Sequence, residues 1–312
     1  MRNIAIDLGG TVIKFGLVGD GRLLDIGSVP SLSQCDFSQT MERLTEIING
    51  LLQKNEIGKD TLDGIGVSVP GIVDVDNNVV LSINKKHEAA VHFDFNEWAE
   101  SNWGRSILME NDARAALIGE WKYGAARTSD NAVMITLGTG IGGAALINGK
   151  LLYGSHFQAG CLGGHLIIDH EGDLCTCGNI GCVESVASSW KLPEIIKGHP
   201  LYRTSVWSGV KIMDFEKLFK AYRSGDKLAF DVVQFCLKAW SAGTINMIHA
   251  YDPDVVVFGG GVMKADDIIL PYIRERVERY SWTPYGSLEI SDAELGNSAA
   301  LHGIDYLLST RK

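Results

Sequence analysis

Two glycine-rich turns, each joining a pair of apolar strands, constrain the fold of this chain more than any other feature. One strand-turn-strand segment covers residues 4–18 and the other covers residues 133–147. When the two are superposed, Ile-Asp-Leu-Gly at 6–9 coincides with Ile-Thr-Leu-Gly at 135–138. This internal similarity predicts that the chain contains two halves built on one plan.

Helical patterns alternate with strand patterns along the rest of the chain, which predicts an α/β fold. We expect helices over 40–53, 95–102, 113–123, 191–197, 214–222, 226–250, 267–280 and 298–308, with Asp94 capping the second. We expect further strands over 64–69, 79–83, 106–109, 254–258 and 288–290. No proline-rich or low-complexity linker interrupts the chain, so the boundary between the halves should be a tight one near 113–130.

Charge and composition exclude several classes of protein. The 28 basic and 38 acidic residues give a formal net charge of −10, which repels nucleic-acid backbones and anionic membranes. The chain enters a strand at Ile4 without a secretory or transit signal, and its apolar runs are far shorter than the ~20 residues that cross a bilayer. We therefore expect a cytoplasmic protein with neither a nucleic-acid nor a membrane partner.

The turn at 138–143 formally matches the glycine fingerprint of dinucleotide-binding proteins, but its context does not. That fingerprint must open a helix. Here residues 144–147 are apolar and are followed by Asn148-Gly149, which is typical of a hairpin. A hydride-transfer enzyme is therefore disfavoured, and the spacing of a P-loop is absent as well.

Two glycine-rich hairpin turns can instead direct backbone N–H groups and threonine hydroxyls at the phosphates of one nucleotide. Asp7 lies at the mouth of the first turn, where a carboxylate next to phosphates requires a Mg²⁺ ion between them. A third glycine run, at 259–261, would let adenine and ribose lie close to the backbone. The alternative is that all three are ordinary tight turns. The nucleotide-binding candidates are Asp7, Gly9, Gly10, Thr11, Lys14, Gly138, Thr139, Gly140, Gly259, Gly260 and Gly261.

Three of the six cysteines, Cys175, Cys177 and Cys182, lie within one short segment that follows His165. In a reducing compartment such clustering favours metal ligation over disulfides. Three thiolates and one imidazole suit a closed tetrahedral Zn²⁺ site, which would be structural. His170 is a rival for the fourth ligand. For Cys35 and Cys236, which stand apart, we expect the role of small buried apolar residues.

These motifs together resemble the ROK family of sugar kinases and repressors. The resemblance rests on residues 7–11 (Asp-Leu-Gly-Gly-Thr), 110–112 (Glu-Asn-Asp), 137–143 and 165–184, and it covers nearly the whole chain. It implies an actin-like ATPase (ribonuclease-H-like) fold, in which two domains with duplicated sheets surround a central cleft. The implied domains are 1–120, completed by a C-terminal helix at 297–312, and 121–296, which carries the zinc-binding loop. ATP and Mg²⁺ as cosubstrates and a homodimer or homotetramer are also implied.

The resemblance also assigns roles to single residues. Asp112 corresponds to the catalytic base and Asn111 to a ligand of the sugar hydroxyls. Glu184 and, less directly, Asn84 correspond to further sugar ligands. His165 corresponds to a metal ligand that also borders the sugar, which favours it over His170. Each of three residues also has a purely structural interpretation: Asp112 as a helix cap, Glu184 as a helix-starting residue and Asn84 as a turn residue.

One departure from the family pattern concerns the sugar. The family's usual Gly-Glu-x-Gly-His reads Cys-Leu-Gly-Gly-His at 161–165, so Leu162 replaces a carboxylate that would accept a sugar hydroxyl. We expect a kinase acting on O6 of a hexose such as glucose, or of an N-acylhexosamine such as N-acetylmannosamine. The alternatives are a sugar-binding pseudokinase, which Leu162 would suit, and a sugar-responsive regulator. The regulator is disfavoured because we expect no helix-turn-helix ahead of the strand at Ile4.

Overall fold

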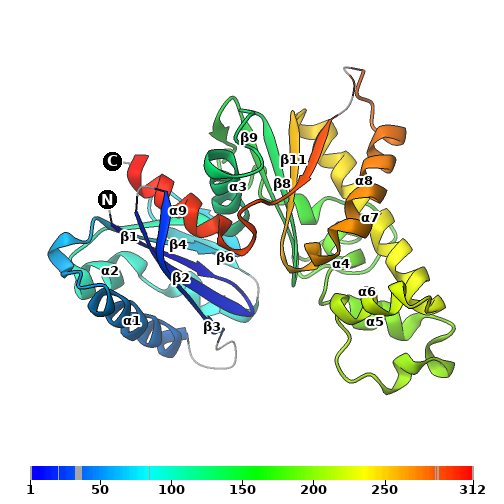
Figure 1. The fold of residues 1–312 in the computed structure, drawn as a ribbon, viewed down its shortest axis with the longest axis horizontal. Coiled ribbons are helices and arrows are strands. Elements are labelled where there is room, and N and C mark those ends of the chain that lie inside the picture. The colour runs from blue at the N-terminus through cyan, green and yellow to red at the C-terminus, as the bar shows by residue number, and fades with distance from the viewer. Residues whose placement is uncertain are drawn as a thin grey trace. The chain divides into compact units, whose positions relative to one another are not determined.

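The computed structural model describes residues 2–19, 21–31, 37–83, 85–284, 286 and 288–310 (Figure 1). The chain forms two compact units. The first comprises Met1–Asp130, Ala144–Cys161 and Ala293–Lys312, and the second comprises Asn131–Gly143 and Leu162–Asp292. The domain boundaries expected from the sequence, 1–120 with 297–312 and 121–296, stay a prediction.

The first sheet is five-stranded and mixed. Its order is β3-β2-β1-β4-β7, with β1 (Asn3–Leu8), β2 (Val12–Gly19), β3 (Arg22–Pro30), β4 (Gly64–Val69) and β7 (Ile107–Asn111). The strands β1, β2 and β3 pair antiparallel, whereas β1, β4 and β7 run parallel. The parallel strands are buried along their whole length, which is why their sequences are almost continuously apolar.

Helices cover both faces of this sheet (Figure 1). They are α1 (Phe37–Lys54), α2 (Phe95–Trp103), α3 (Asp112–Tyr123) and α9 (Ala299–Thr310). The α1 helix buries Met41, Leu44, Ile48 and Leu51, whose spacing of three and four residues makes one apolar stripe. On the other side α9 packs on β1 and β4 and lies along α3. The expected cap of α2 is confirmed, because the Asp94 carboxylate accepts a hydrogen bond from the backbone N–H of Glu97.

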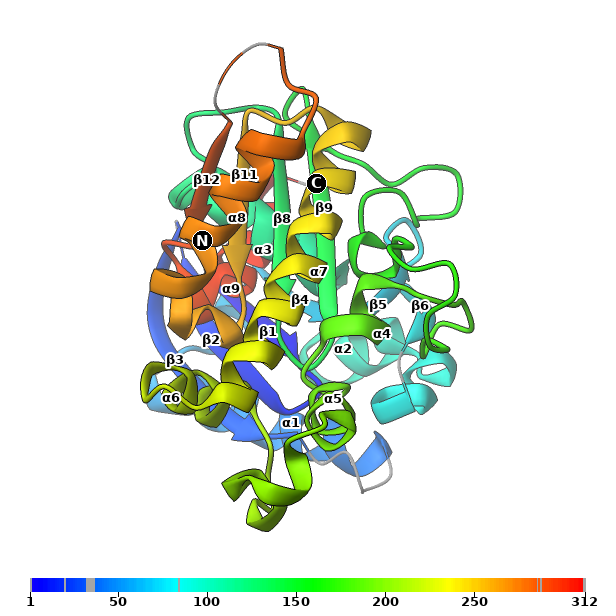
Figure 2. The same ribbon diagram turned by 90° about the vertical axis from the view of Figure 1, so that its right-hand side faces the viewer.

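The second sheet repeats this plan. Its order is β10-β9-β8-β11-β12, with β8 (Ala132–Leu137), β9 (Ile141–Ile147), β10 (Lys150–Leu151), β11 (Val255–Gly259) and β12 (Glu289–Asp292). Here β11 runs parallel to both β8 and β12. The accompanying helices are α4 (Val183–Ala187), α5 (Leu192–Gly198), α6 (Phe215–Arg223), α7 (Lys227–Tyr251) and α8 (Asp266–Tyr280). The long α7 contacts β8 and lies beside α8 (Figure 2).

The two sheets share one arrangement. A glycine turn joins β1 to β2 in the first sheet and β8 to β9 in the second. The strand before each turn also pairs with a parallel strand, β1 with β4 and β8 with β11. The predicted α/β fold with two related halves is confirmed. Three strands were not predicted, and one of them is the two-residue β10. The edge strand β3 is partly exposed along its length and contains Gly27, and β5 (Gly71–Asp74), which pairs with β6 (Val79–Ile83), begins directly after the breaker Pro70.

Two further features concern the apolar character of the helices and the two isolated cysteines. In the described part of the chain, no helix combines the length and the apolar character that spanning a bilayer requires. Cys236 is fully buried, as expected, and burial raises the pKa of its thiol. Cys35 lies outside the described residues.

Candidate active site and metal centre

Asp7 lies near the end of β1, and its carboxylate is held by two neighbouring strands. The Ser68 hydroxyl donates to Asp7 Oδ1 over 2.9 Å, and the Lys14 ammonium lies 3.0 Å from Asp7 Oδ2. Both partners are directly opposite Asp7 in the sheet, Lys14 in the antiparallel pair with β2 and Ser68 in the parallel pair with β4. The sheet register therefore fixes the direction of a carboxylate at the mouth of the first glycine turn.

Asn111 and Asp112 lie where β7 ends and α3 begins. Asn111 is the residue that caps α3: its Oδ1 accepts a hydrogen bond from the backbone N–H of Arg114 over 3.1 Å. Asn111 Nδ2 donates to the carbonyl of Gly71 and to Asp112 Oδ1. The capping role that the sequence left open for Asp112 thus belongs to its neighbour. Asp112 is the first residue of the helix, and its Oδ1 also accepts from the backbone N–H of Ala113.

The surroundings of Asp112 favour its protonated form. Desolvation by the surrounding protein is the largest effect, and the negative charge of Asp7 adds to it, so that the pKa of Asp112 rises to about 7. Hydrogen bonding by the Ala113 amide and the charge of Lys14 oppose this rise. A carboxylate with a pKa near neutrality is suited to accepting a proton at physiological pH.

A buried ion pair stabilises the junction of β7 and α3, which carries Asn111 and Asp112. Arg114 in α3 and Glu110, four residues earlier in β7, are fully buried, with 3.8 Å between Arg114 Nη1 and Glu110 Oε1. The same Glu110 oxygen accepts from the Asn111 N–H, and the other accepts from the Tyr153 hydroxyl over 2.7 Å. Arg114 Nη2 donates to three carbonyls, those of residues 152, 157 and 159. One guanidinium thus ties the start of α3 to the loop after β10.

Replacing Arg114 with methionine is expected to destabilise the protein by about 3–5 kcal/mol, because the buried Glu110 carboxylate would lose its cation. Urea unfolding followed by circular dichroism measures this change. The matched control is Arg127→Met: Arg127 pairs with Glu294, but both side chains are about half exposed, so a cost of about 0–1 kcal/mol is expected. Equal costs at the two positions would contradict the assigned role of the buried pair.

The second glycine turn lies between β8 and β9 and is held by residues that follow the cysteine segment. The turn is closed by the Gly138 N–H, which donates to the Gly140 carbonyl over 3.0 Å. The carbonyls of Gly138 and Thr139 accept from the backbone N–H groups of Ser189 and Trp190. The Glu184 carboxylate, which is buried, accepts from the N–H of Ile141 over 2.8 Å.

The third glycine run lies at the end of β11 and packs against the strand before the second turn. Gly259 is opposite Thr136 in the parallel pair of β11 and β8. Gly260 has a φ of 95°, and a Cβ there would collide with the backbone carbonyl of Leu137. Only glycine readily adopts this positive φ and also lacks the Cβ that would collide. The predicted second and third turns therefore lie side by side at the carboxyl ends of β8 and β11, two inner strands of the second sheet.

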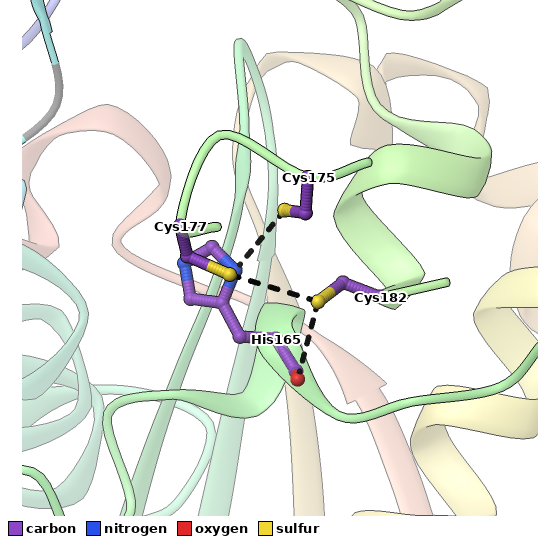
Figure 3. Close-up of side chains that lie close together, drawn as sticks. All are labelled: His165, Cys175, Cys177 and Cys182. Carbon is purple, nitrogen blue, oxygen red and sulfur yellow. Dashed lines mark hydrogen bonds between the residues drawn. The ribbon is translucent and has the colours of Figure 1, made fainter. Parts of the chain in front are cut away.

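His165, Cys175, Cys177 and Cys182 come together in the second unit (Figure 3). Their ligand atoms lie within 4.8 Å of one another. Cys177 Sγ and Cys182 Sγ are 3.8 Å apart, and Cys175 Sγ is 3.5 Å from His165 Nδ1. Tetrahedral Zn²⁺ with ordinary bond lengths places two sulfurs about 3.8 Å apart, and a sulfur and a nitrogen about 3.6 Å apart. The donor set and its spacing therefore fit zinc.

In the absence of a metal ion, the surroundings of this cluster favour protonated thiols over thiolates. Burial, followed by the neighbouring sulfur of Cys175, raises the pKa of Cys182, and burial also raises the pKa of Cys175. Thiols in these surroundings release their protons readily only when a metal ion compensates the charge. The rival ligand His170 is not in the cluster, and its side chain is 90% exposed beside Glu171.

The structure thus gathers the predicted residues into local groups. In the first unit, Asp7 and Lys14 are paired and Asn111 contacts Asp112. In the second, Glu184 links the glycine turn at 138–141 to the cysteine segment at 175–182. Asn84 lies outside the described residues. Sequence reasoning missed Ser68 and Arg114. The signal for Ser68 was a polar residue near the end of an otherwise apolar strand, next to the strand that carries Asp7.

Two sheets on one plan, each with a glycine turn, define the actin-like ATPase fold that solved ROK sugar kinases also have. The sequence model of the ROK family matches residues 3–311, and the chain belongs to this family.

Named relatives match most or all of the chain. The chain is 29% identical to a glucokinase of Thermotoga maritima over 318 residues, which are 100% of this chain and 98% of the relative. It is 30% identical to an N-acetylmannosamine kinase of Vibrio cholerae, over 85% of this chain and 86% of the relative. Among solved structures, a ROK family glucokinase from Streptomyces griseus in complex with glucose and AMPPNP has a TM-score of 0.81 at 28% identity and covers 98% of this chain and 99% of its own.

Proposed function

We propose that this protein is an ATP-dependent sugar kinase that phosphorylates O6 of a hexose such as glucose, or of an N-acylhexosamine such as N-acetylmannosamine. The observation that carries this proposal is the Asp112 carboxylate at the start of α3, whose pKa is raised to about 7. Family membership and the glucokinase and N-acetylmannosamine kinase relatives support the same activity.

In the proposed reaction Asp112 accepts the proton of the sugar hydroxyl while that oxygen attacks the γ-phosphorus of ATP. The bond from the γ-phosphorus to the bridging oxygen breaks, and ADP leaves with the electron pair. Asn111, Glu184, His165 and Asn84 are proposed to bind the other sugar hydroxyls. Because phosphoryl transfer has a loose transition state, positioning and charge stabilisation supply most of the acceleration.

The phosphates are proposed to bind to the two glycine turns and Lys14, and the adenosine to residues 259–261. A Mg²⁺ ion is proposed to bind through the Asp7 carboxylate, because carboxylate oxygens are the ligand type that Mg²⁺ prefers. When bound, Mg²⁺ would offset the charge of the phosphates. His165, Cys175, Cys177 and Cys182 would hold a structural Zn²⁺ that fixes the shape of their loop.

The raised pKa of Asp112 gives the activity a defined pH dependence. Only the deprotonated carboxylate can accept the hydroxyl proton, so kcat should fall about tenfold per pH unit below an apparent pKa near 7. Initial rates of ADP formation at saturating sugar and ATP, measured from pH 5.5 to 9, test this expectation. A kcat that stays constant across that range would contradict the assignment of Asp112 as the base.

The proposed activity is tested by a screen for sugar-dependent ADP release with glucose, mannose, galactose and their N-acetylated 2-amino derivatives. Phosphorus NMR of the product then shows which oxygen carries the phosphate. We expect one sugar to give a rate well above the ATPase background. If none does so in the presence of Mg²⁺ and zinc-loaded protein, the kinase proposal fails.

A second candidate function is a sugar-binding regulator or pseudokinase. It is favoured by one observation, Leu162 in place of the family's carboxylate, directly before the single 3-10 turn (Gly163–His165) that carries His165. Sugar binding by calorimetry without phosphoryl transfer would support it, and operator binding in a shift assay would indicate a regulator. The cytoplasmic location and the homodimer or homotetramer remain expectations.

A further inference from the structure

Glu184 connects the metal-binding loop, residues 175–182, to the second glycine turn at 138–141. Its Oε1 accepts hydrogen bonds from the Thr176 hydroxyl over 3.1 Å and from the Trp190 indole N–H over 3.3 Å. Its Oε2 accepts from the Ile141 N–H over 2.8 Å. The residue is only 3% exposed, so these three donors offset much of the cost of burying its charge.

The glycine turn is shaped around this carboxylate. A Cβ at Gly140 would overlap Glu184 Oε2, so the backbone approaches the carboxylate more closely than any other residue would allow. Trp190, which donates its indole N–H to Glu184, also donates its backbone N–H to the Thr139 carbonyl over 3.2 Å. Moving the Glu184 carboxylate would therefore change the conformation of the turn.

The metal-binding loop in turn determines where Glu184 lies. Thr176 is the residue between the ligands Cys175 and Cys177, and its side chain reaches back to Glu184. The α4 helix begins directly after the ligand Cys182 and carries Glu184 in its first turn. Both the donor and the acceptor of the Thr176–Glu184 hydrogen bond are thus placed by residues that surround the metal site.

We infer that Glu184 is a positioning residue for the nucleotide's phosphates, which acts through the turn at 138–141, and that the metal-binding loop holds it in place through Thr176. This inference rests on the proposed function, in which that turn binds ATP. It adds to the sugar contact that the family resemblance assigns to Glu184. It predicts that a change in the metal-binding loop affects nucleotide affinity separately from sugar affinity.

The test is Thr176→Val in the zinc-loaded, full-length protein. This substitution removes the hydroxyl and keeps the shape of the side chain. Calorimetry with AMPPNP and Mg²⁺ should show nucleotide binding that is about 5–10-fold weaker, because one hydrogen bond to a buried carboxylate is lost. The dissociation constants for glucose and N-acetylmannosamine should change less than that for AMPPNP, because Glu184 is only one of several proposed sugar ligands, and KM for ATP should rise more than kcat falls.

Two further variants complete the test. Thr204→Val is the matched control, since the Thr204 hydroxyl donates to the nearby Leu201 carbonyl, and it should leave nucleotide affinity unchanged. Thr176→Ser keeps the hydroxyl and should restore nucleotide affinity and any zinc lost from Thr176→Val. Unchanged nucleotide affinity in Thr176→Val, an equal fall in sugar affinity, or no restoration by Thr176→Ser would overturn the inference.

The failures of the two proposals are distinguishable. If the unaltered protein phosphorylates a sugar and Thr176→Val binds AMPPNP normally, only the positioning role of Glu184 is wrong. If the unaltered protein binds neither AMPPNP nor sugar, the kinase proposal fails and the inference fails with it.

Discussion

Asp112→Asn is expected to lower kcat on the order of 10³-fold while the sugar dissociation constant changes by less than about threefold. A positioned general base contributes roughly 10²–10⁴-fold, and an amide cannot accept the hydroxyl proton. Affinity should survive because the amide oxygen can still accept a hydrogen bond from a sugar hydroxyl, as the carboxylate would. Steady-state kinetics and sugar calorimetry on the same preparation measure both quantities.

Asp94→Asn is the matched control for this substitution. Asp94 also lies at the start of a helix in the first unit, where its side chain caps α2, and asparagine caps helices as well as aspartate does. We expect unchanged kcat and an unchanged unfolding midpoint. Turnover by Asp112→Asn within tenfold of the unaltered protein would remove Asp112 from its role as the base.

The second large effect is expected from loss of the metal. Purified protein should contain about one zinc ion per chain, and Cys182→Ser should contain almost none, because a closed structural site tolerates few changes of ligand. Metal binding contributes directly to the folding of such sites. We therefore expect the unfolding midpoint of Cys182→Ser to fall by several degrees and kcat/KM to fall about 100-fold or more. Metal analysis by mass spectrometry, thermal unfolding and kinetics measure the three effects.

Cys161→Ser provides the control for the metal content. Cys161 is a buried thiol outside the cluster, and its Sγ donates to backbone carbonyls, as a serine hydroxyl would. This variant should retain its zinc. Fully folded and active protein that contains no metal, or full zinc occupancy in Cys182→Ser, would show that the cluster is not a structural zinc site.

Much of the fold could be predicted because the features that encode it are local in sequence. The two glycine turns repeat the same residue types at the same positions relative to apolar strands, and the helices have clear apolar periodicity. The edge strand β3 could not be found in this way. It is partly exposed on both faces, so its residues show neither a continuous apolar run nor a clean alternation of buried and exposed positions.

In the candidate site, too, features that are local in sequence could be predicted, whereas contacts between distant segments could not. Three of the four zinc ligand candidates lie within eight residues of sequence, and their chemistry can be recognised without a fold. The contacts of Asp7 with Ser68 and of Arg114 with the loop after β10 depend on strand register and chain path, because their partners are 61 and 38–45 residues apart. Local sequence reasoning offered only Asp112 as a cap of α3, whereas the structure identifies Asn111.

The parallel course of β1, β4 and β7 separates two kinds of surface on the first unit. Asp7, Ser68 and Asn111 all lie toward the carboxyl ends of these strands, whereas Asn3, Gly64 and Ile107 lie at their amino ends. The chain before β4 and before β7, at 55–63 and 104–106, therefore reaches the sheet on the side away from these polar groups. Insertions and deletions accumulated there during evolution would leave the chemistry intact. New substrate preferences would instead arise in the segments that follow the strands, and so the scaffold and the specificity of such an enzyme can evolve independently.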